Sequence, residues 1–306
     1  RRLTRYNQCL RSASPAACPG ALDETSAGPN RQGRAANKAG LVGGPRDLSE
    51  LTRVAPFNDL DAVEAALADG SVACVITEPV MTNCAMVLPQ PGFHAGLREL
   101  TRRYGTLLLI DETHTLSTGP GGYTSAFGLE PDLFVVGKAI AGGVPAAVWG
   151  MSEEVVDRLN RARAALPPGH SGIGTTLSGS PLQLAALRAT LEEVATEAAY
   201  AHMNATADAM QATLDAVIAK AGLPWHVARC GARVEVVRSA RPLRNGAEAK
   251  AAHFGALEAT IHLAMLVRGT LISPFHDMML ASPSTTAEQV GRMGRAMDEV
   301  LARLAG

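Results

Sequence analysis

Residues 106–138 read TLLLIDETHTLSTGPGGYTSAFGLEPDLFVVGK, and this stretch decides the fold. Its apolar runs at 106–110 and 132–136 are each typical of a strand that is buried on both faces. A third apolar run at 72–76 and a helical pattern at 92–104 lie upstream. Because strands alternate with helices along the chain, the sequence predicts an α/β fold whose sheet is at least partly parallel.

Functional side chains follow the three predicted strands. Glu78 comes after the first strand, Asp111 after the second and Lys138 after the third. We expect them to meet in one crevice, because open α/β sheets bind ligands at the carboxyl ends of their strands. A buried lysine can form a Schiff base, and an aspartate beside a pyridinium nitrogen keeps that ring protonated. A surface lysine and a helix-capping aspartate would give the same pattern, so the strand ends alone leave both interpretations open.

The composition is that of an ordinary globular protein, with 306 residues, 47% hydrophobic and 19% charged. The 28 Lys and Arg nearly balance the 29 Asp and Glu, so nothing indicates binding to nucleic acid or to an acidic membrane. We find no apolar stretch of the ~18 residues that a membrane helix needs and no apolar core of a signal peptide. The five scattered cysteines include no C-x-x-C pair. We therefore expect a cytoplasmic protein with reduced thiols and no metal site.

Segments around Asp111 and Lys138 resemble the class III aminotransferases, in particular the branch with glutamate-1-semialdehyde aminomutases and β-amino-acid transaminases. The resemblance is carried by 109–115 (LIDETHT), 119–123 (GPGGY) and 137–145 (GKAIAGGVP). It continues in order through residues 77–83, 174–179, 224–227, 231–235, 268–269 and 273–276. The resemblance implies an aspartate-aminotransferase-like fold of type I, pyridoxal 5'-phosphate (PLP) as cofactor, and a homodimer with active sites at its interface.

The resemblance also implies roles for the residues that would surround the cofactor. Lys138 matches the lysine that forms the Schiff base and moves the proton, and Asp111 matches the partner of the pyridinium nitrogen. Thr113 would pack on the ring face, and His114 would bond the 3-hydroxyl unless it is a structural histidine. Thr176 matches a threonine that reaches the cofactor phosphate of the neighbouring subunit, with a simple turn or helix cap as the alternative.

The resemblance also points to residues that would recognise the substrate. Arg233 matches an arginine that binds the substrate carboxylate, and Arg229 competes for that role. Glu78 lies in the loop on the substrate side, where a structural hydrogen bond is as good an explanation as catalysis. The implied function is transfer of an amino group between an amino acid, possibly a β-amino acid, and a keto acid. A 2,1-aminomutase of the glutamate-1-semialdehyde type is the alternative, since both reactions use Lys138 and Asp111.

The N-terminal part departs from the family. Residues 1–50 match it poorly and are expected to be irregular, and Cys18-Pro19-Gly20 stands where relatives have Tyr-His-Gly. The glycine-rich loop that holds the cofactor phosphate is not found. We therefore expect a truncated large domain at 51–180 with a mostly parallel sheet, followed by a connecting helix and a small α+β domain at 181–306. A non-catalytic remnant that only dimerises or binds partners is the alternative of another class.

Within the small domain, the sequence predicts short strands and longer helices in alternation. Residues 233–237 alternate like a half-buried strand, and 270–272 read as a second strand. Helical patterns cover 247–267 and 286–304.

Overall fold

The computed structural model describes residues 9–13, 27–29, 35–37, 52–165, 178–274 and 276–305. Up to residue 151 the strands are β1 (Cys9–Ala13), β2 (Ala27–Pro29), β3 (Ala35–Asn37), β4 (Thr52–Pro56), β5 (Cys74–Thr77), β6 (Leu107–Asp111), β7 (Leu133–Gly137) and β8 (Ala147–Met151). The helices of this part are α1 (Leu60–Leu67), α2 (Phe93–Arg103), the 3-10 helix η3 (Thr115–Thr118), α3 (Gly122–Ala126), the 3-10 helix η4 (Lys138–Ala141) and α4 (Glu153–Ala164).

The C-terminal part is mainly helical. Its helices are α5 (Pro181–Ala189), the π-helix η5 (Thr190–Val194), α6 (Glu197–Ala221), α7 (Gly246–Ala251), α8 (Gly255–Leu266) and α9 (Ala287–Ala305). Its strands are β9 (His226–Cys230), β10 (Arg233–Val237) and β11 (Met278–Leu280). Within the described ranges, none of the helices combines the length and the apolar character that a membrane crossing requires.

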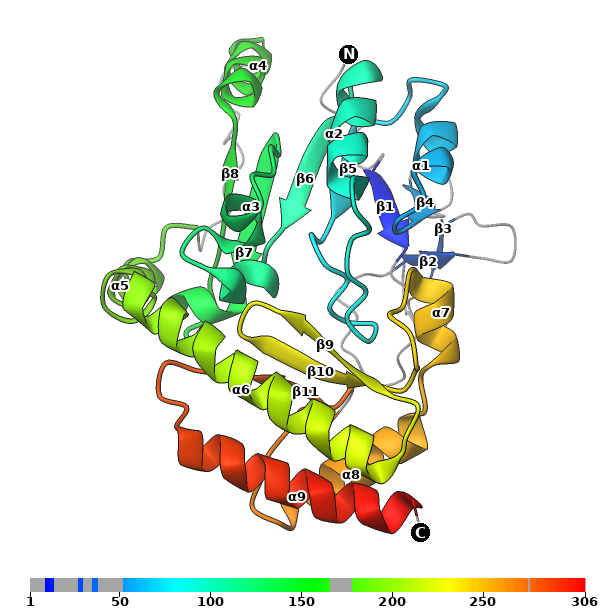
Figure 1. The fold of residues 1–306 in the computed structure, drawn as a ribbon. Helices are drawn as coiled ribbons and strands as arrows, with labels where there is room; N and C mark the ends of the chain where they lie inside the picture. The colour runs from blue at the N-terminus through cyan, green and yellow to red at the C-terminus, as the bar shows by residue number, and fades with distance from the viewer. Residues whose placement is uncertain are drawn as a thin grey trace.

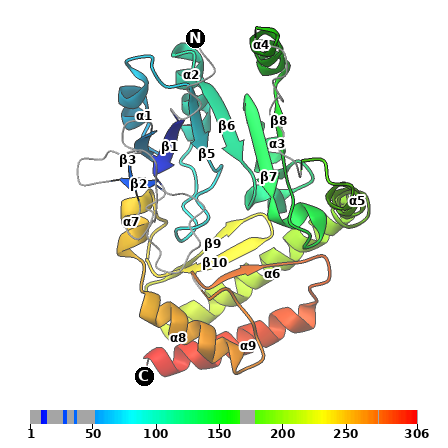
Figure 2. The ribbon, with the colours of Figure 1, turned by 180° about the vertical axis from the view of Figure 1, so that it is seen from behind.

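A mostly parallel sheet organises the upper part of the molecule (Figure 1). Its strand order is β4-β1-β5-β6-β7-β8, and only the β7–β8 pair is antiparallel. The predicted α/β fold with a partly parallel sheet is therefore confirmed. The parallel strands end at the edge of the sheet that faces the small domain, where β9, β10 and β11 form a second sheet against α6 (Figure 2).

Within residues 1–50, the described stretches 9–13, 27–29 and 35–37 are strands, whereas the sequence predicts irregular structure. The structure places three short strands there, and β1 lies inside the large sheet between β4 and β5. Cys9 pairs with Thr52 on one side and Cys74 on the other. Hydrogen bonds from two neighbours can hold a strand whose own sequence shows weak periodicity, which explains why the pattern of residues did not predict it. The sequence did not predict β4 either, which lies at the edge of the sheet and is hydrogen-bonded to β1.

The small domain corrects three predictions. The strand at 233–237 is not half-buried, because β10 is the central strand of its sheet and all five residues are buried. The second strand is β11 rather than 270–272, and it pairs Leu280 with Arg233. The helical stretch at 247–267 is broken into α7 and α8, since Phe254 adopts a non-helical backbone with φ of -127° and ψ of 71° before α8 begins.

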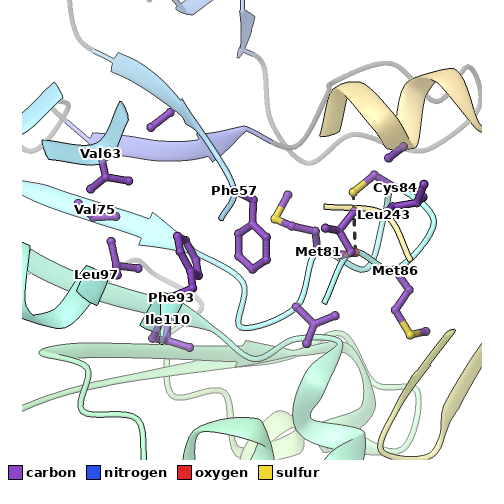
Figure 3. Close-up of a cluster of buried hydrophobic side chains, with 14 of the residues drawn as sticks. Phe57, Val63, Val75, Met81, Cys84, Met86, Phe93, Leu97, Ile110 and Leu243 are labelled. Atoms are coloured by element: carbon purple, nitrogen blue, oxygen red, sulfur yellow. Dashed lines mark hydrogen bonds between the residues drawn. The ribbon is translucent and has the colours of Figure 1, made fainter. Parts of the chain in front are cut away.

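The hydrophobic core of the large sheet includes side chains from the small domain. Phe57, Phe93 and Leu97 pack around Ile110 in its central part, and Leu243 reaches the same cluster from the small domain, beside Cys84. Figure 3 shows that the segment carrying Leu243 lies against the loop of Cys84 and Met86. The two sheets therefore share one continuous apolar contact.

A buried ionic group stabilises the small domain below this core. The Arg238 guanidinium donates to Glu258 at 3.3 Å and to Asp277, and all three side chains are at most 4% exposed. Glu258 also accepts from the backbone N–H of His276 at 3.2 Å. This fixes a turn in which His276 and Asp277 both have positive φ. His253, Glu258 and His276 bring potential metal-ligand atoms within 4.8 Å of one another, but Glu258 is already paired with the Arg238 guanidinium.

We expect Arg238→Met to lower the free energy of unfolding by about 3–5 kcal/mol, because it leaves two buried carboxylates without their cation. The matched control is Arg292→Met, which removes only an exposed pair with Glu288 and should cost about 0.5 kcal/mol or less. Urea unfolding followed by circular dichroism measures both. Equal losses for the two variants would contradict the assignment.

Candidate active site

Three strand ends bring the predicted functional residues together. Glu78 follows β5, Asp111 ends β6, and Lys138 follows β7. The three strands are neighbours and parallel, with Thr77 paired to Ile110 and Asp111 paired to Val135. The Asp111 carboxylate and the Lys138 ammonium lie close enough to Glu78 to influence the pKa of its carboxyl.

Lys138 occupies an unusual backbone position. It has φ of 56°, in the left-handed region that non-glycine residues avoid. Gly137 before it is extended, and the buried side chains of Ile140 and Ala141 hold η4 behind it. Strain of this kind costs about 1–3 kcal/mol and is concentrated at functional sites.

A chain of hydrogen bonds leads away from Lys138. Its Nζ lies 2.7 Å from Nε2 of His114, and Nδ1 of His114 lies 2.5 Å from the Thr82 hydroxyl. That hydroxyl donates to Glu78 at 2.6 Å, and the Thr82 backbone N–H donates to the same oxygen at 3.3 Å. Sequence reasoning missed Thr82, although it lies inside the 77–83 segment. Only the turn after β5 shows that its hydroxyl reaches His114.

Burial changes the acid–base behaviour of this chain. It raises the pKa of Glu78 to about 7, and the nearby Asp111 carboxylate acts in the same direction. Burial, together with the cations Arg233 and Lys138, lowers the pKa of His114 to about 3. The imidazole is therefore neutral near pH 7 and carries one N–H.

Asp111 and Thr113 form a tight turn at the end of β6. The Asp111 carboxylate accepts a hydrogen bond from the Thr113 backbone N–H at 2.9 Å, and both side chains are half-buried. A carboxylate and a lysine on neighbouring strand ends fit the two contacts that a pyridine-aldehyde cofactor requires, one for its ring nitrogen and one for its aldehyde. Thr176, the predicted phosphate contact, lies outside the described residues, as do Cys18, Pro19 and Gly20.

The two candidate arginines have different surroundings. Arg233 is 7% exposed; one guanidinium nitrogen contacts the Met278 sulfur at 3.0 Å and another donates weakly to the His114 carbonyl at 3.5 Å. Its Nε has no hydrogen bond, and among the described residues no carboxylate forms an ion pair with it. Arg229 is instead ion-paired with Asp208 and bonded to two backbone carbonyls of its own domain. The geometry favours Arg233 as the group available to a carboxylate ligand.

Comparison with known protein families shows to which family these residues belong. The family model described as "Aminotransferase class-III" matches residues 45–289. The chain belongs to the class-III aminotransferase family. The architecture predicted from the sequence, an aspartate-aminotransferase-like fold of type I, is thereby confirmed.

The chain is similar to several named members of this family. It is 37% identical over 254 residues to a glutamate-1-semialdehyde 2,1-aminomutase of Anaeromyxobacter dehalogenans, covering 82% of this chain and 57% of that protein. It is 48% identical to the crystal structure of a glutamate-1-semialdehyde-aminomutase from Pseudomonas aeruginosa PAO1, with a TM-score of 0.89, covering 97% of this chain and 66% of the other. A β-phenylalanine aminotransferase from Variovorax paradoxus, 24% identical, shares the fold with a TM-score of 0.78, covering 98% of this chain and 65% of the other. The chain thus spans about three fifths of the length of these relatives.

Glu112 is a second residue that sequence reasoning missed in this member of the class-III aminotransferase family. Its carboxylate is fully buried and accepts from the Thr115 hydroxyl and from the backbone N–H groups of Tyr123, at 3.1 Å, and Thr124, at 2.5 Å. It ties the turn that carries His114 to the start of α3. The signal in the sequence was the glycine pair at 121–122, since Gly122 has φ of +65° and packs directly on Glu112.

We expect Gly122→Ala to destabilise the protein by about 1–3 kcal/mol more than Gly128→Ala, because only the first methyl group collides with a buried side chain. Both glycines have positive φ. A Cβ at Gly122 would lie 2.6 Å from a Glu112 oxygen, whereas a Cβ at Gly128 meets nothing within 4 Å. Denaturant unfolding of the two variants gives the difference. If the two variants unfold alike, Glu112 does not hold the turn as tightly as the contacts indicate.

Proposed function

We propose that this chain is the catalytic part of a PLP-dependent enzyme that moves amino groups, with Lys138 as the residue that binds the cofactor covalently. The observation that carries the proposal is the position of Lys138, which projects from a strained turn at one strand end while Asp111 ends the neighbouring strand. A related structure of the Pseudomonas protein, 48% identical to this chain, is a complex with PMP, which supports the choice of cofactor.

Pyridoxal phosphate, when bound, supplies an aldehyde that condenses with amines and a ring that withdraws electrons. The residues of this chain would hold and orient it. Asp111 would keep the ring nitrogen protonated, Thr113 would cover one ring face, and His114 lies near enough to Lys138 to contact the 3-hydroxyl side. Thr176 would reach the phosphate from a neighbouring subunit.

Two reactions of amino acids fit these residues. The 2,1-aminomutase reaction on a semialdehyde is the better supported, because the curated relatives at 34–37% identity and the 48% identical structure all carry that name. Transfer from an amino acid to a keto acid is the second candidate, since Arg233 is a buried cation without an ion-pair partner among the described residues. Incubation with a semialdehyde alone, followed by product analysis, separates the two: isomerisation without any added amino acceptor indicates the mutase.

The proposal includes a homodimer, because Thr176 would act across subunits. Exposed apolar side chains support it: Leu182 and Leu184 on α5 are 69% and 52% exposed, and Leu191 and Val194 on η5 are 45% and 50% exposed. Exposed apolar side chains are costly in water, and covering them in an assembly would remove that cost.

We expect borohydride reduction in the presence of PLP to label Lys138 and no other lysine. Lys138→Ala should abolish the label and the absorbance of the bound cofactor. Lys220→Ala, which removes an exposed pair with Asp298, should leave both unchanged. Peptide mapping by mass spectrometry reads the result, and a label on any other lysine would refute the assignment.

We expect Arg233→Ala to weaken binding of amino acids on the order of 100-fold, because a charge pair between buried groups is lost. Amines that lack a carboxylate should bind the variant about as well as the wild type. Titrating the cofactor absorbance with an amino acid and its decarboxylated analogue measures both. Arg229→Ala is the comparison, and a selective loss of acid binding there would transfer the role to Arg229.

A further inference from the structure

Thr82 has no role in the assignments above, although it lies at the centre of the site. It is 3% exposed, and its hydroxyl is within 2.6 Å of both Glu78 and His114. A hydroxyl in such a position has one hydrogen to give and can accept others. Whether the Thr82 hydroxyl donates to Glu78 or to His114 determines which nitrogen of His114 carries the N–H.

The groups at the two ends of this hydrogen-bond chain, Glu78 and Lys138, set that direction. Burial raises the pKa of Glu78 to about 7, so above that pH its carboxylate is ionised and only accepts hydrogen bonds, whereas a Lys138 ammonium only donates them. Thr82 must therefore donate to Glu78 and accept from Nδ1–H of His114. The same direction follows from the other end, since Lys138 must donate to Nε2. The neutral ring of His114, whose pKa is lowered to about 3 by burial and nearby cations, satisfies both ends in one tautomer only.

We propose that Thr82 and Glu78 are positioning residues that hold His114 in the Nδ1–H tautomer and so keep its Nε2 as a hydrogen-bond acceptor facing Lys138. This hydrogen-bond arrangement makes and breaks no covalent bond. Its significance for Lys138 rests on the proposed function, whereas the tautomer itself is a property of the protein without cofactor.

The tautomer matters most when Lys138 loses its proton. A neutral amine has one lone pair, and that pair must attack a carbonyl. With Nε2 as acceptor, His114 takes an N–H of the amine and leaves the lone pair available. The other tautomer would donate Nε2–H to the lone pair and block it. Once the lysine is neutral, only Glu78, acting through Thr82, still enforces the productive direction.

The test is histidine tautomer analysis by NMR on the cofactor-free chain, at a pH well above 7 so that Glu78 is ionised. Long-range ¹H–¹⁵N spectra of protein labelled at its eight histidines distinguish Nδ1–H from Nε2–H, and His114→Gln identifies the His114 signals. We expect the wild type to show Nδ1–H. Thr82→Val, which removes the hydroxyl at nearly constant volume, should shift the tautomer ratio toward Nε2–H by about tenfold, and Thr82→Ser should restore it.

Thr106→Val is the matched control, because Thr106 is also 3% exposed but bonds the Val72 carbonyl. It should leave His114 unchanged. A wild type in the Nε2–H tautomer, or a Thr82→Val protein that keeps Nδ1–H, would overturn the proposal. Thr82→Ala gives the same readout if the valine variant does not fold. Borohydride labelling is a separate measurement, so failure to label Lys138 with the expected tautomer present would count against the function and not against Thr82.

Discussion

The left-handed turn at Lys138 is the constraint on which the site depends. The chain leaves β7 through an extended glycine and then reverses at a residue with φ of 56°. This places the ammonium beside His114 instead of along the sheet. The turn is unfavourable by itself, since a left-handed L-residue costs roughly 1–2 kcal/mol. Burial of Ile140 and Ala141 behind it offsets this cost. The packing of η4 therefore also determines where the Lys138 amine lies.

The sequence predicted the part of the site that follows from strand order. Glu78, Asp111 and Lys138 each follow an apolar run, and parallel strands end at one edge of a sheet, so their meeting required no knowledge of loops. Thr82 and Glu112 were missed because their contacts depend on turns, whose geometry is not periodic. The same limit explains the small domain, where a buried central strand has both faces covered and β11 is recognised only by its pairing with β10.

Arg229 and Arg233 show what burial adds to a sequence motif. Both belong to the same hairpin, and their side chains are equally suited to a carboxylate. The structure separates them by their partners: Asp208 neutralises one, while the other faces a sulfur and a backbone carbonyl. A cation that is buried with weak partners raises the energy of the empty site, and an anionic ligand would relieve that cost.

The shared core between the two sheets has a mechanical consequence. Leu243, Val237 and Ala249 of the small domain belong to the same apolar cluster as Phe57 and Phe93 of the large one. A hinge between two bodies requires an interface that can open without exposing apolar surface, and opening this one would expose apolar side chains of the shared cluster. The small domain also has a second core of its own, which includes Leu214, Val234 and Met297, but the shared cluster makes it unlike a lid that swings freely. Access to Lys138 would have to change through loops and side chains at the edge of the sheet.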